Sequence, residues 1–146
     1  ISFWTSLDPI SKENGPMEFI RKSHKWGKWY QPEHFAPGAS KTYEKNPKFE
    51  KIPDIESNPD QYEIISFDMS PGDLLAFHAL VVHGSAGNIS KYRRRRGYAV
   101  RYTGKDVFYC TEKGSHLDLR NPELEDGDHL DSKQYPVVWE KDKNVL

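Results

Sequence analysis

Short apolar runs, each closed by a glycine or proline turn, are the feature that most constrains how this chain can fold. The runs have the alternation, or the β-branched and aromatic content, that predicts β-strands. They lie at residues 1–7, 17–21, 62–69, 74–83, 95–103 and 106–110. Asn-Gly-Pro at 14–16 and Ser-Pro-Gly-Asp at 70–73 are strong turn signals. With almost no helical periodicity, this pattern predicts an all-β fold of the sandwich or jelly-roll type.

The expected jelly roll is incomplete. A double-stranded β-helix (jelly roll, cupin-like) has eight strands, and the pattern supplies roughly six. Residues 26–60 are polar and proline-rich, so we predict a long loop insertion over the mouth of a barrel. Residues 111–146 are predicted to be a polar C-terminal tail. The domain prediction is one partial jelly-roll domain over 1–146.

Composition excludes several classes of protein. With 36% hydrophobic and 13% aromatic residues, the chain is too apolar to be disordered. A net charge of −1 offers no field that would attract nucleic acid or an anionic membrane. The longest apolar stretch is interrupted by His78 and is far too short to span a bilayer. The single cysteine, Cys110, cannot form an internal disulfide, so we expect a cytoplasmic protein.

The first residues, Ile-Ser-Phe-Trp-Thr, form an apolar segment without an initiator methionine. Such a segment predicts a strand that needs a partner, so we expect a fragment of a longer protein. A barrel that lacks two strands exposes a sheet edge. We therefore expect a homodimer or a higher assembly through that edge.

A histidine and an arginine are the candidate site residues. His83 ends an apolar strand and begins a glycine-containing loop, where an imidazole is held rigidly with one side open, as a catalytic metal ligand requires. An arginine from the run 93–96 begins the next strand and could form a bidentate pair with a carboxylate. Alone this signal is weak, because a histidine near a strand end is more often structural.

A family resemblance strengthens the signal. Residues 72–78 read Gly-Asp-Leu-Leu-Ala-Phe-His, residues 83–88 read His-Gly-Ser-Ala-Gly-Asn, and an Arg-Arg pair precedes a strand that ends in Arg101-Tyr102. This order resembles the C-terminal signature of the phytanoyl-CoA dioxygenase family. Residues 3–8, 14–20, 23–25 and 126–139 are similar to other parts of that family. Lys22 departs from the pattern, because the family usually has glycine just before Ser-His.

The resemblance implies a non-haem Fe(II)/2-oxoglutarate-dependent oxygenase. Iron is held in that family by two histidines and one carboxylate. His83 matches the second histidine, whereas the first histidine and the carboxylate belong before Phe3 and are absent here. The intact protein is expected to hydroxylate a small organic substrate, with Fe(II) and 2-oxoglutarate as cofactors. We expect little or no activity from the fragment itself.

Arg95 is the expected partner of 2-oxoglutarate. On a strand Arg95 shares a face with Gly97, Ala99 and Arg101, and small neighbours suit a barrel interior that admits a co-substrate. By its spacing from His83, Arg94 is the runner-up. Asn88 is a second cofactor-binding candidate: it either contacts the co-substrate or orients the loop of His83, and a plain turn role explains it equally well.

The other histidines are weaker candidates. Two His-x-Asp triplets, at 116–118 and 129–131, follow His83 in polar sequence with no strand to hold them, so we expect neither to share its metal. His78 is predicted to lie in the core or behind the site, and His24 to be a loop residue.

Two readings of other classes stay open. The chain could be a metal-free jelly-roll module that binds a small molecule or anion through His83 and Arg95. It could also be an inactive structural remnant. Metal content separates the enzyme from both.

Overall fold

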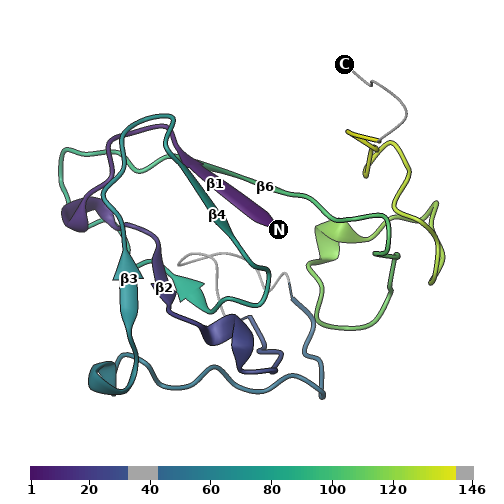
Figure 1. Ribbon diagram of the computed structural model, residues 1–146, viewed down its shortest axis with the longest axis horizontal. Helices are drawn as coiled ribbons and strands as arrows, with labels where there is room; N and C mark the ends of the chain where they lie inside the picture. The colour runs from purple at the N-terminus through teal and green to yellow at the C-terminus, as the bar shows by residue number, and fades with distance from the viewer. Residues whose placement is uncertain (33–42, 141–146) are drawn as a thin grey trace. The chain divides into compact units, whose positions relative to one another are not determined.

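The computed structural model describes residues 1–32 and 43–140 (Figure 1). Backbone contacts divide the chain into two compact units. The first unit contains residues 1–29 and 52–102, and the second contains residues 30–51 and 103–146. The predicted division into one domain, an insertion and a tail stays a prediction. Residues 33–42 of the insertion and 141–146 of the tail lie outside the described residues.

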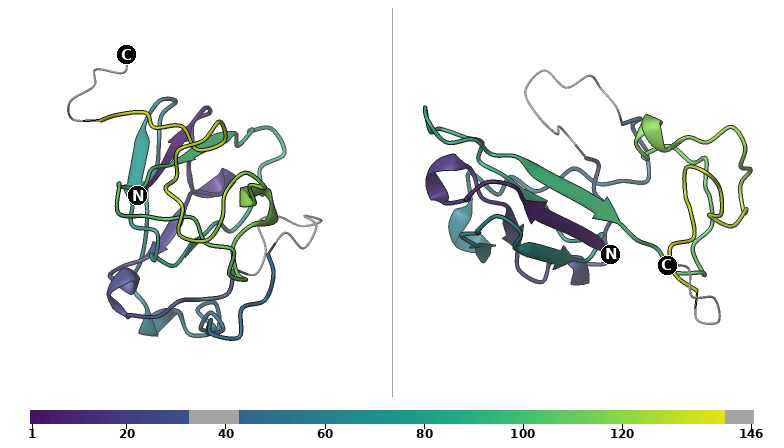
Figure 2. Two further views of the ribbon diagram at one scale, coloured as in Figure 1. Left: turned by 90° about the vertical axis from the view of Figure 1, so that its right-hand side faces the viewer. Right: turned by 90° about the horizontal axis from the view of Figure 1, so that it is seen from above.

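The first sheet of the first unit is built around the N-terminal strand. Strand β1 (Ser2–Ser6) pairs antiparallel with β4 (Leu74–Phe77) on one side and with β6 (Gly97–Arg101) on the other. Trp4 lies opposite Leu75 and Ala99. The three strands run side by side in Figures 1 and 2. Because β1 alternates buried and half-buried residues, one of its faces, with Trp4, belongs to the core.

The second sheet of the same unit is smaller. Strand β2 (Glu18–Ile20) pairs antiparallel with β3 (Ile64–Ser66) and with β5 (His83–Gly84). Phe19 lies opposite Ile65 and His83. The ring centroids of Phe19 and Phe77 are 5.0 Å apart, so the two sheets contact each other through these aromatic residues.

The core of the first unit is centred on Trp4. Trp4, Ile10 and Met69 are buried together, with half-buried Met17, Leu75 and Phe77 packed against them. Gly97 is needed beside this indole. A Cβ atom at Gly97 would lie 2.2 Å from the Trp4 ring, closer than carbon atoms can approach.

Turns and one-turn 3-10 helices connect the strands. In the first unit these helices are η1 (Lys12–Asn14), η2 (Ser23–Lys25) and η3 (Pro59–Gln61). The second unit contains η4 (Leu117–Leu119). Its other regular features are the single β-bridges Tyr30–Glu50, Tyr43–His116 and Phe108–His129.

The all-β prediction is confirmed for the part of the chain that the structure describes, where helices are three residues long. Two antiparallel sheets are compatible with a jelly roll. The predicted strand 74–83 was wrong as a single strand. It ends at Phe77, and a turn closed by a 3.1 Å hydrogen bond from Val81 N to His78 O carries the chain from one sheet to the other.

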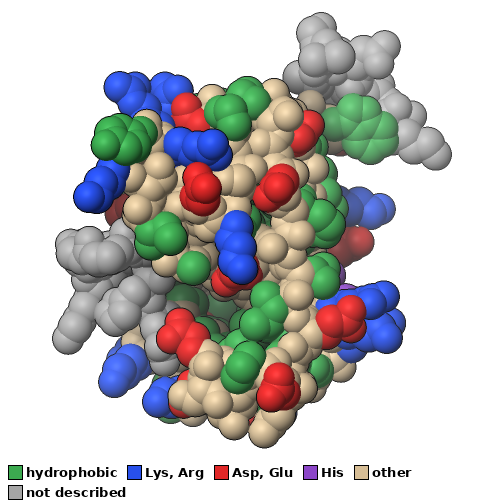
Figure 3. All heavy atoms as spheres, turned by 90° about the vertical axis from the view of Figure 1, so that its left-hand side faces the viewer, with side chains coloured by type: hydrophobic (Ala, Val, Ile, Leu, Met, Phe, Trp, Pro, Cys, Tyr) green, Lys and Arg blue, Asp and Glu red, His purple; other side chains and the backbone are tan. Residues whose placement is uncertain are grey.

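Two other predicted strands are shorter than expected. The run 95–103 becomes a strand only at Gly97. The run 106–110 contributes only Phe108, in its bridge to His129. Hydrophobic side chains stand at the surface between charged ones (Figure 3). In the first unit Leu74 is 57% and Tyr98 61% exposed, because these side chains lie on the face of their sheet away from Trp4.

Candidate metal and co-substrate site

His83 is held on strand β5 with one ring nitrogen engaged. Its Nδ1 lies 2.8 Å from the carbonyl oxygen of Val81, and its ring stacks on Phe19 with the centroids 6.0 Å apart. Metal-binding histidines usually donate one ring N–H to such a carbonyl, which fixes the tautomer and leaves the other nitrogen for the metal. His83 is otherwise exposed. Its environment therefore fits a metal ligand that binds through Nε2.

Arg95 is the half-buried member of the four consecutive arginines. Its Nε donates a 2.6 Å hydrogen bond to the carbonyl oxygen of Gly15, and its Nη2 lies 3.4 Å from the sulfur of Met17. The guanidinium carbon is 5.4 Å from the centre of the Trp4 ring, a cation–π distance. Burial lowers the pKa of Arg95. None of the described carboxylates forms an ion pair with this guanidinium.

The neighbouring arginines are exposed. Arg96 binds Asp8 with two nitrogens, and the side-chain hydrogen bond from Arg96 is the main reason that the pKa of Asp8 falls to about 2. Arg93 lies 3.7 Å from Glu13. The side chains around Arg95 therefore set it apart as the guanidinium that is partly withdrawn from water and lacks an acidic partner.

Asn88 closes a turn. Its Nδ2 donates to the carbonyl oxygen of Arg93 at 2.7 Å, and its Oδ1 accepts from the backbone N–H of Ser90 at 2.9 Å. These bonds order the loop between His83 and Arg95. Contact with a co-substrate stays a prediction for this residue.

Comparison with known proteins places this chain in a family. The profile of the phytanoyl-CoA dioxygenase (PhyH) family matches residues 1–97. The chain belongs to the phytanoyl-CoA dioxygenase family. It is also 27% identical over 112 residues to the human peroxisomal phytanoyl-CoA dioxygenase. That match covers 77% of this chain but 30% of the human protein, so the chain spans about a third of its relative's length. No solved structure matches.

The described part of the chain does not contain a complete metal centre. Among residues 1–32 and 43–140, no group of three or more His, Cys, Asp or Glu side chains is arranged to hold a metal ion. Both His-x-Asp triplets lie in the second unit. His116 caps η4 and packs edge-on against Tyr43, and His129 packs against Phe108. His83 and Arg95, both in the first unit, stay the candidates for an iron and 2-oxoglutarate site.

The turn before η2 has lysine at position 22, where the PhyH pattern has glycine, and the backbone conformation there is one that favours glycine. Lys22 has φ 63°, the left-handed conformation that glycine adopts without strain.

His24, in the 3-10 helix that follows Lys22, and His78 lie with their ring centroids 5.5 Å apart. His78 is exposed, so the core alternative predicted for it was wrong, while a place behind the site stays a prediction. The turn at 78–81 moves it out of the strand.

Sequence reasoning missed the residues that surround Arg95. The sequence predicts a turn at Asn14 and Gly15 and strands at Trp4 and Met17, and the family resemblance includes all four, but neither gives them a part in the site. An Asn-Gly turn gives no hint that its amide is fully buried, as that of Asn14 is. Only the long-range contacts of these residues reveal their part in the site.

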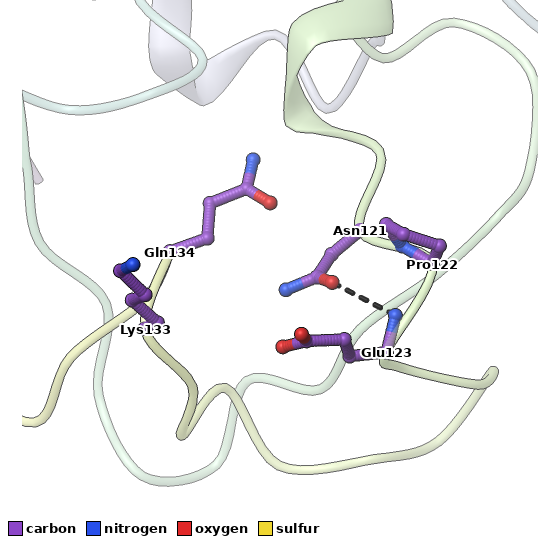
Figure 4. A pocket seen from close by; sticks show the side chains of 5 residues that line it. All are labelled: Asn121, Pro122, Glu123, Lys133 and Gln134. Carbon is purple, nitrogen blue, oxygen red and sulfur yellow. Dashed lines mark hydrogen bonds between the residues drawn. The ribbon is translucent and has the colours of Figure 1, made fainter.

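A shallow cavity lies elsewhere, in the second unit. It has a volume of about 380 Å³ and is lined by Asn121, Pro122, Glu123, Lys133 and Gln134 (Figure 4). The Oδ1 of Asn121 accepts a 2.9 Å hydrogen bond from the backbone N–H of Glu123, so this side chain serves its own loop. Neither His83 nor Arg95 lines this cavity.

In the described part of the chain, no helix is long and apolar enough to cross a membrane.

Proposed function

We propose that the protein containing this chain is a non-haem Fe(II)/2-oxoglutarate-dependent hydroxylase of a small organic substrate. The observation that carries the proposal is Arg95: a half-buried guanidinium without an acidic partner, close to the loop that follows His83. Withdrawing a cation from water is unfavourable unless an anion compensates it. A dicarboxylate co-substrate supplies that anion.

The remaining iron ligands are proposed to come from sequence before Phe3, where the family has a His-x-Asp or His-x-Glu motif. His83 contributes Nε2, held in position by the bond of Nδ1 to Val81 O. Bound iron would supply the oxidising chemistry with dioxygen as the oxidant: one oxygen atom would enter succinate as 2-oxoglutarate loses CO2, and the other would enter the hydroxylated substrate. The chain's own contribution is to orient His83 and to pair Arg95 with the far carboxylate, with Asn88 ordering the loop between them.

Paired arginine variants of the full-length protein test the role of Arg95. Arg95→Ala should weaken 2-oxoglutarate binding by about 2–5 kcal/mol, because a buried charged hydrogen-bonding partner is lost. Arg94→Ala is the matched control and should change it by less than about 0.5 kcal/mol, since exposed side chains contribute little. Anaerobic titration calorimetry measures the Kd for 2-oxoglutarate in both variants. A larger loss of affinity in Arg94→Ala than in Arg95→Ala would assign the role to Arg94.

Iron binding tests the role of His83. The full-length protein should bind Fe(II) far more tightly than residues 1–146 alone, because this chain is proposed to supply one ligand of three. His83→Ala in the full-length protein should weaken Fe(II) binding to nearly the level of residues 1–146 alone. Equal, tight binding by both proteins would contradict the proposal. Absence of iron from the full-length protein, together with anion binding that needs Arg95, would favour the metal-free binding module.

The assembly and compartment remain proposals. Strands β4 and β6 are the outer strands of their sheet within the described residues, so a homodimer through one of these edges is a reasonable expectation. A monomer in light scattering at high concentration would contradict it. A cytoplasmic location also stays a prediction, and the human relative is named as peroxisomal.

A further inference from the structure

We infer that Asn14 and Gly15 form a positioning turn that sets Arg95 and the loop of His83 relative to each other. On this inference, which rests on the proposed function, co-substrate affinity depends on two residues that do not touch the co-substrate. Asn14 acts on the backbone beside Arg95, and Gly15 acts on both the Arg95 side chain and the loop.

Asn14 is fully buried, and both of its N–H donors are used. Its Nδ2 donates to the carbonyl oxygens of Pro9 at 2.8 Å and Arg94 at 3.0 Å, and its Oδ1 accepts from the backbone N–H of Ser11 at 2.8 Å. The bond to Arg94 O spans 80 residues of sequence and fixes the peptide that leads into Arg95. A buried amide with these partners is costly to remove, because they would be left unsatisfied.

The carbonyl oxygen of Gly15 accepts two hydrogen bonds. One comes from Arg95 Nε at 2.6 Å, and the other from the hydroxyl of Ser85 at 3.1 Å. Ser85 lies two residues after His83. A single backbone oxygen therefore ties the candidate co-substrate residue to the loop of the candidate metal ligand.

Gly15 also sets how closely that loop approaches. It has φ 82°, and a Cβ atom there would lie 2.4 Å from the carbonyl oxygen of Gly87. Any side chain would thus be strained itself and would push the loop of residues 85–88 away. The glycine is required both by its own conformation and by the close approach of the loop.

The physical effect is preorganisation of a flexible side chain. An arginine loses rotamer entropy when it is held in one geometry for a ligand. The Gly15 carbonyl holds Arg95 through Nε before the ligand arrives, so less entropy is lost on binding. Among the described residues, Nη1 of Arg95 makes no hydrogen bond, which leaves that nitrogen available to an anion.

The test compares three variants of the full-length protein. Asn14→Ala and Gly15→Ala should each raise the Kd for 2-oxoglutarate, measured by anaerobic calorimetry, by about tenfold or more. Ser6→Ala is the control, because Ser6 is also fully buried but its hydroxyl bonds Asp8 O and makes no hydrogen bond to Arg95, Gly15 or Ser85. It should lower stability and leave the Kd unchanged. A Kd raised equally in all three variants would overturn the inference.

A second readout does not depend on the ligand. The NMR signal of the Arg95 Nε–H, assigned through its loss in Arg95→Lys, should exchange with solvent about tenfold faster in Asn14→Ala than in Ser6→Ala. Unchanged exchange in Asn14→Ala would overturn the inference. If Asn14→Ala does not fold, Asn14→Asp replaces it, since it keeps the shape and the acceptor for Ser11 N but loses the two N–H donors. If Arg95→Ala leaves the Kd unchanged while this exchange still responds to Asn14, the proposed function fails and the positioning turn stands.

Discussion

The two units of this chain are stabilised in different ways. In the first unit, six strands pair in two sheets and bury Trp4, Ile10 and Met69 in one cluster. In the described part of the second unit the backbone forms single bridges, and the buried side chains are mainly amides that bond the backbone, such as Asn46 and Asn121. Truncating a large core aromatic side chain to alanine costs about 3–5 kcal/mol, whereas a typical hydrogen bond contributes about 0.5–1.5 kcal/mol. The unit with the candidate site is therefore expected to be the more rigid one.

The largest effect should come from the centre of the first unit. Trp4→Ala removes the 7%-exposed indole against which Arg95 and Gly97 pack, and should lower the free energy of unfolding by about 3–5 kcal/mol. Trp139→Ala in the second unit, where the indole is 73% exposed, should lower it by less than about 0.5 kcal/mol. Urea denaturation measures both, and similar losses would contradict the comparison.

A smaller, local effect is expected in the second unit. The side chain of Asn121 accepts a hydrogen bond from Glu123 N through Oδ1 and donates one to the Ser132 hydroxyl through Nδ2. The backbone N–H of Asn121 donates to the hydroxyl of buried Tyr109 at 2.7 Å. Asn121→Ala should destabilise this unit by about 1–3 kcal/mol, because it removes the two side-chain hydrogen bonds to Glu123 and Ser132 while keeping the backbone bond to Tyr109. Hydrogen exchange should become faster at residues 109–132 and stay unchanged at β1. Exchange that rises equally in both regions would show that the units unfold together.

Acid should weaken a surface contact in each unit. In the first, Arg96 lowers the pKa of Asp8 to about 2; in the second, hydrogen bonds from Thr111 lower that of Asp126. A carboxyl whose folded pKa is lowered adds stability that is present above its unfolded pKa, about 3.9. That stability is lost as the pH falls through the folded value. Asp8→Asn should therefore flatten the pH dependence of stability between about pH 4 and 2, as thermal melts would measure, and an unchanged slope would contradict this.

The smallest effect concerns backbone strain before η2. Lys22 adopts the left-handed conformation, which costs a non-glycine residue roughly 1–2 kcal/mol, while glycine costs about 0.5–1 kcal/mol in chain entropy. Lys22→Gly should thus stabilise the first unit by up to about 1 kcal/mol. Lys25→Gly, within η2, is the matched control and should destabilise it slightly. Loss of stability in both variants would argue against strain at Lys22.

Much of the fold was predictable because strand signals are local. The runs at 1–7, 17–21 and 62–69 contain β1, β2 and β3. The run 74–83 was not resolved correctly, because an apolar pattern broken by the single residue His78 does not reveal that its two ends belong to different sheets. A turn at His78 makes that change, and one polar residue within an apolar run does not by itself predict a turn. The division into two units was also invisible, since it depends on contacts between distant segments.

The sequence by itself determined the all-β class, the family resemblance, and the chemistry of the candidate site. A histidine that ends a strand and an arginine that begins the next are properties of residue type and period-two spacing, which are local. Only the tertiary structure decided that Arg95 is half-buried and that the buried amide of Asn14 bonds the backbone next to it. The physical reason is that burial and long-range hydrogen bonds result from packing of the whole unit, because a pairing across 80 residues forms only when the surrounding contacts offset the entropy of closing that loop.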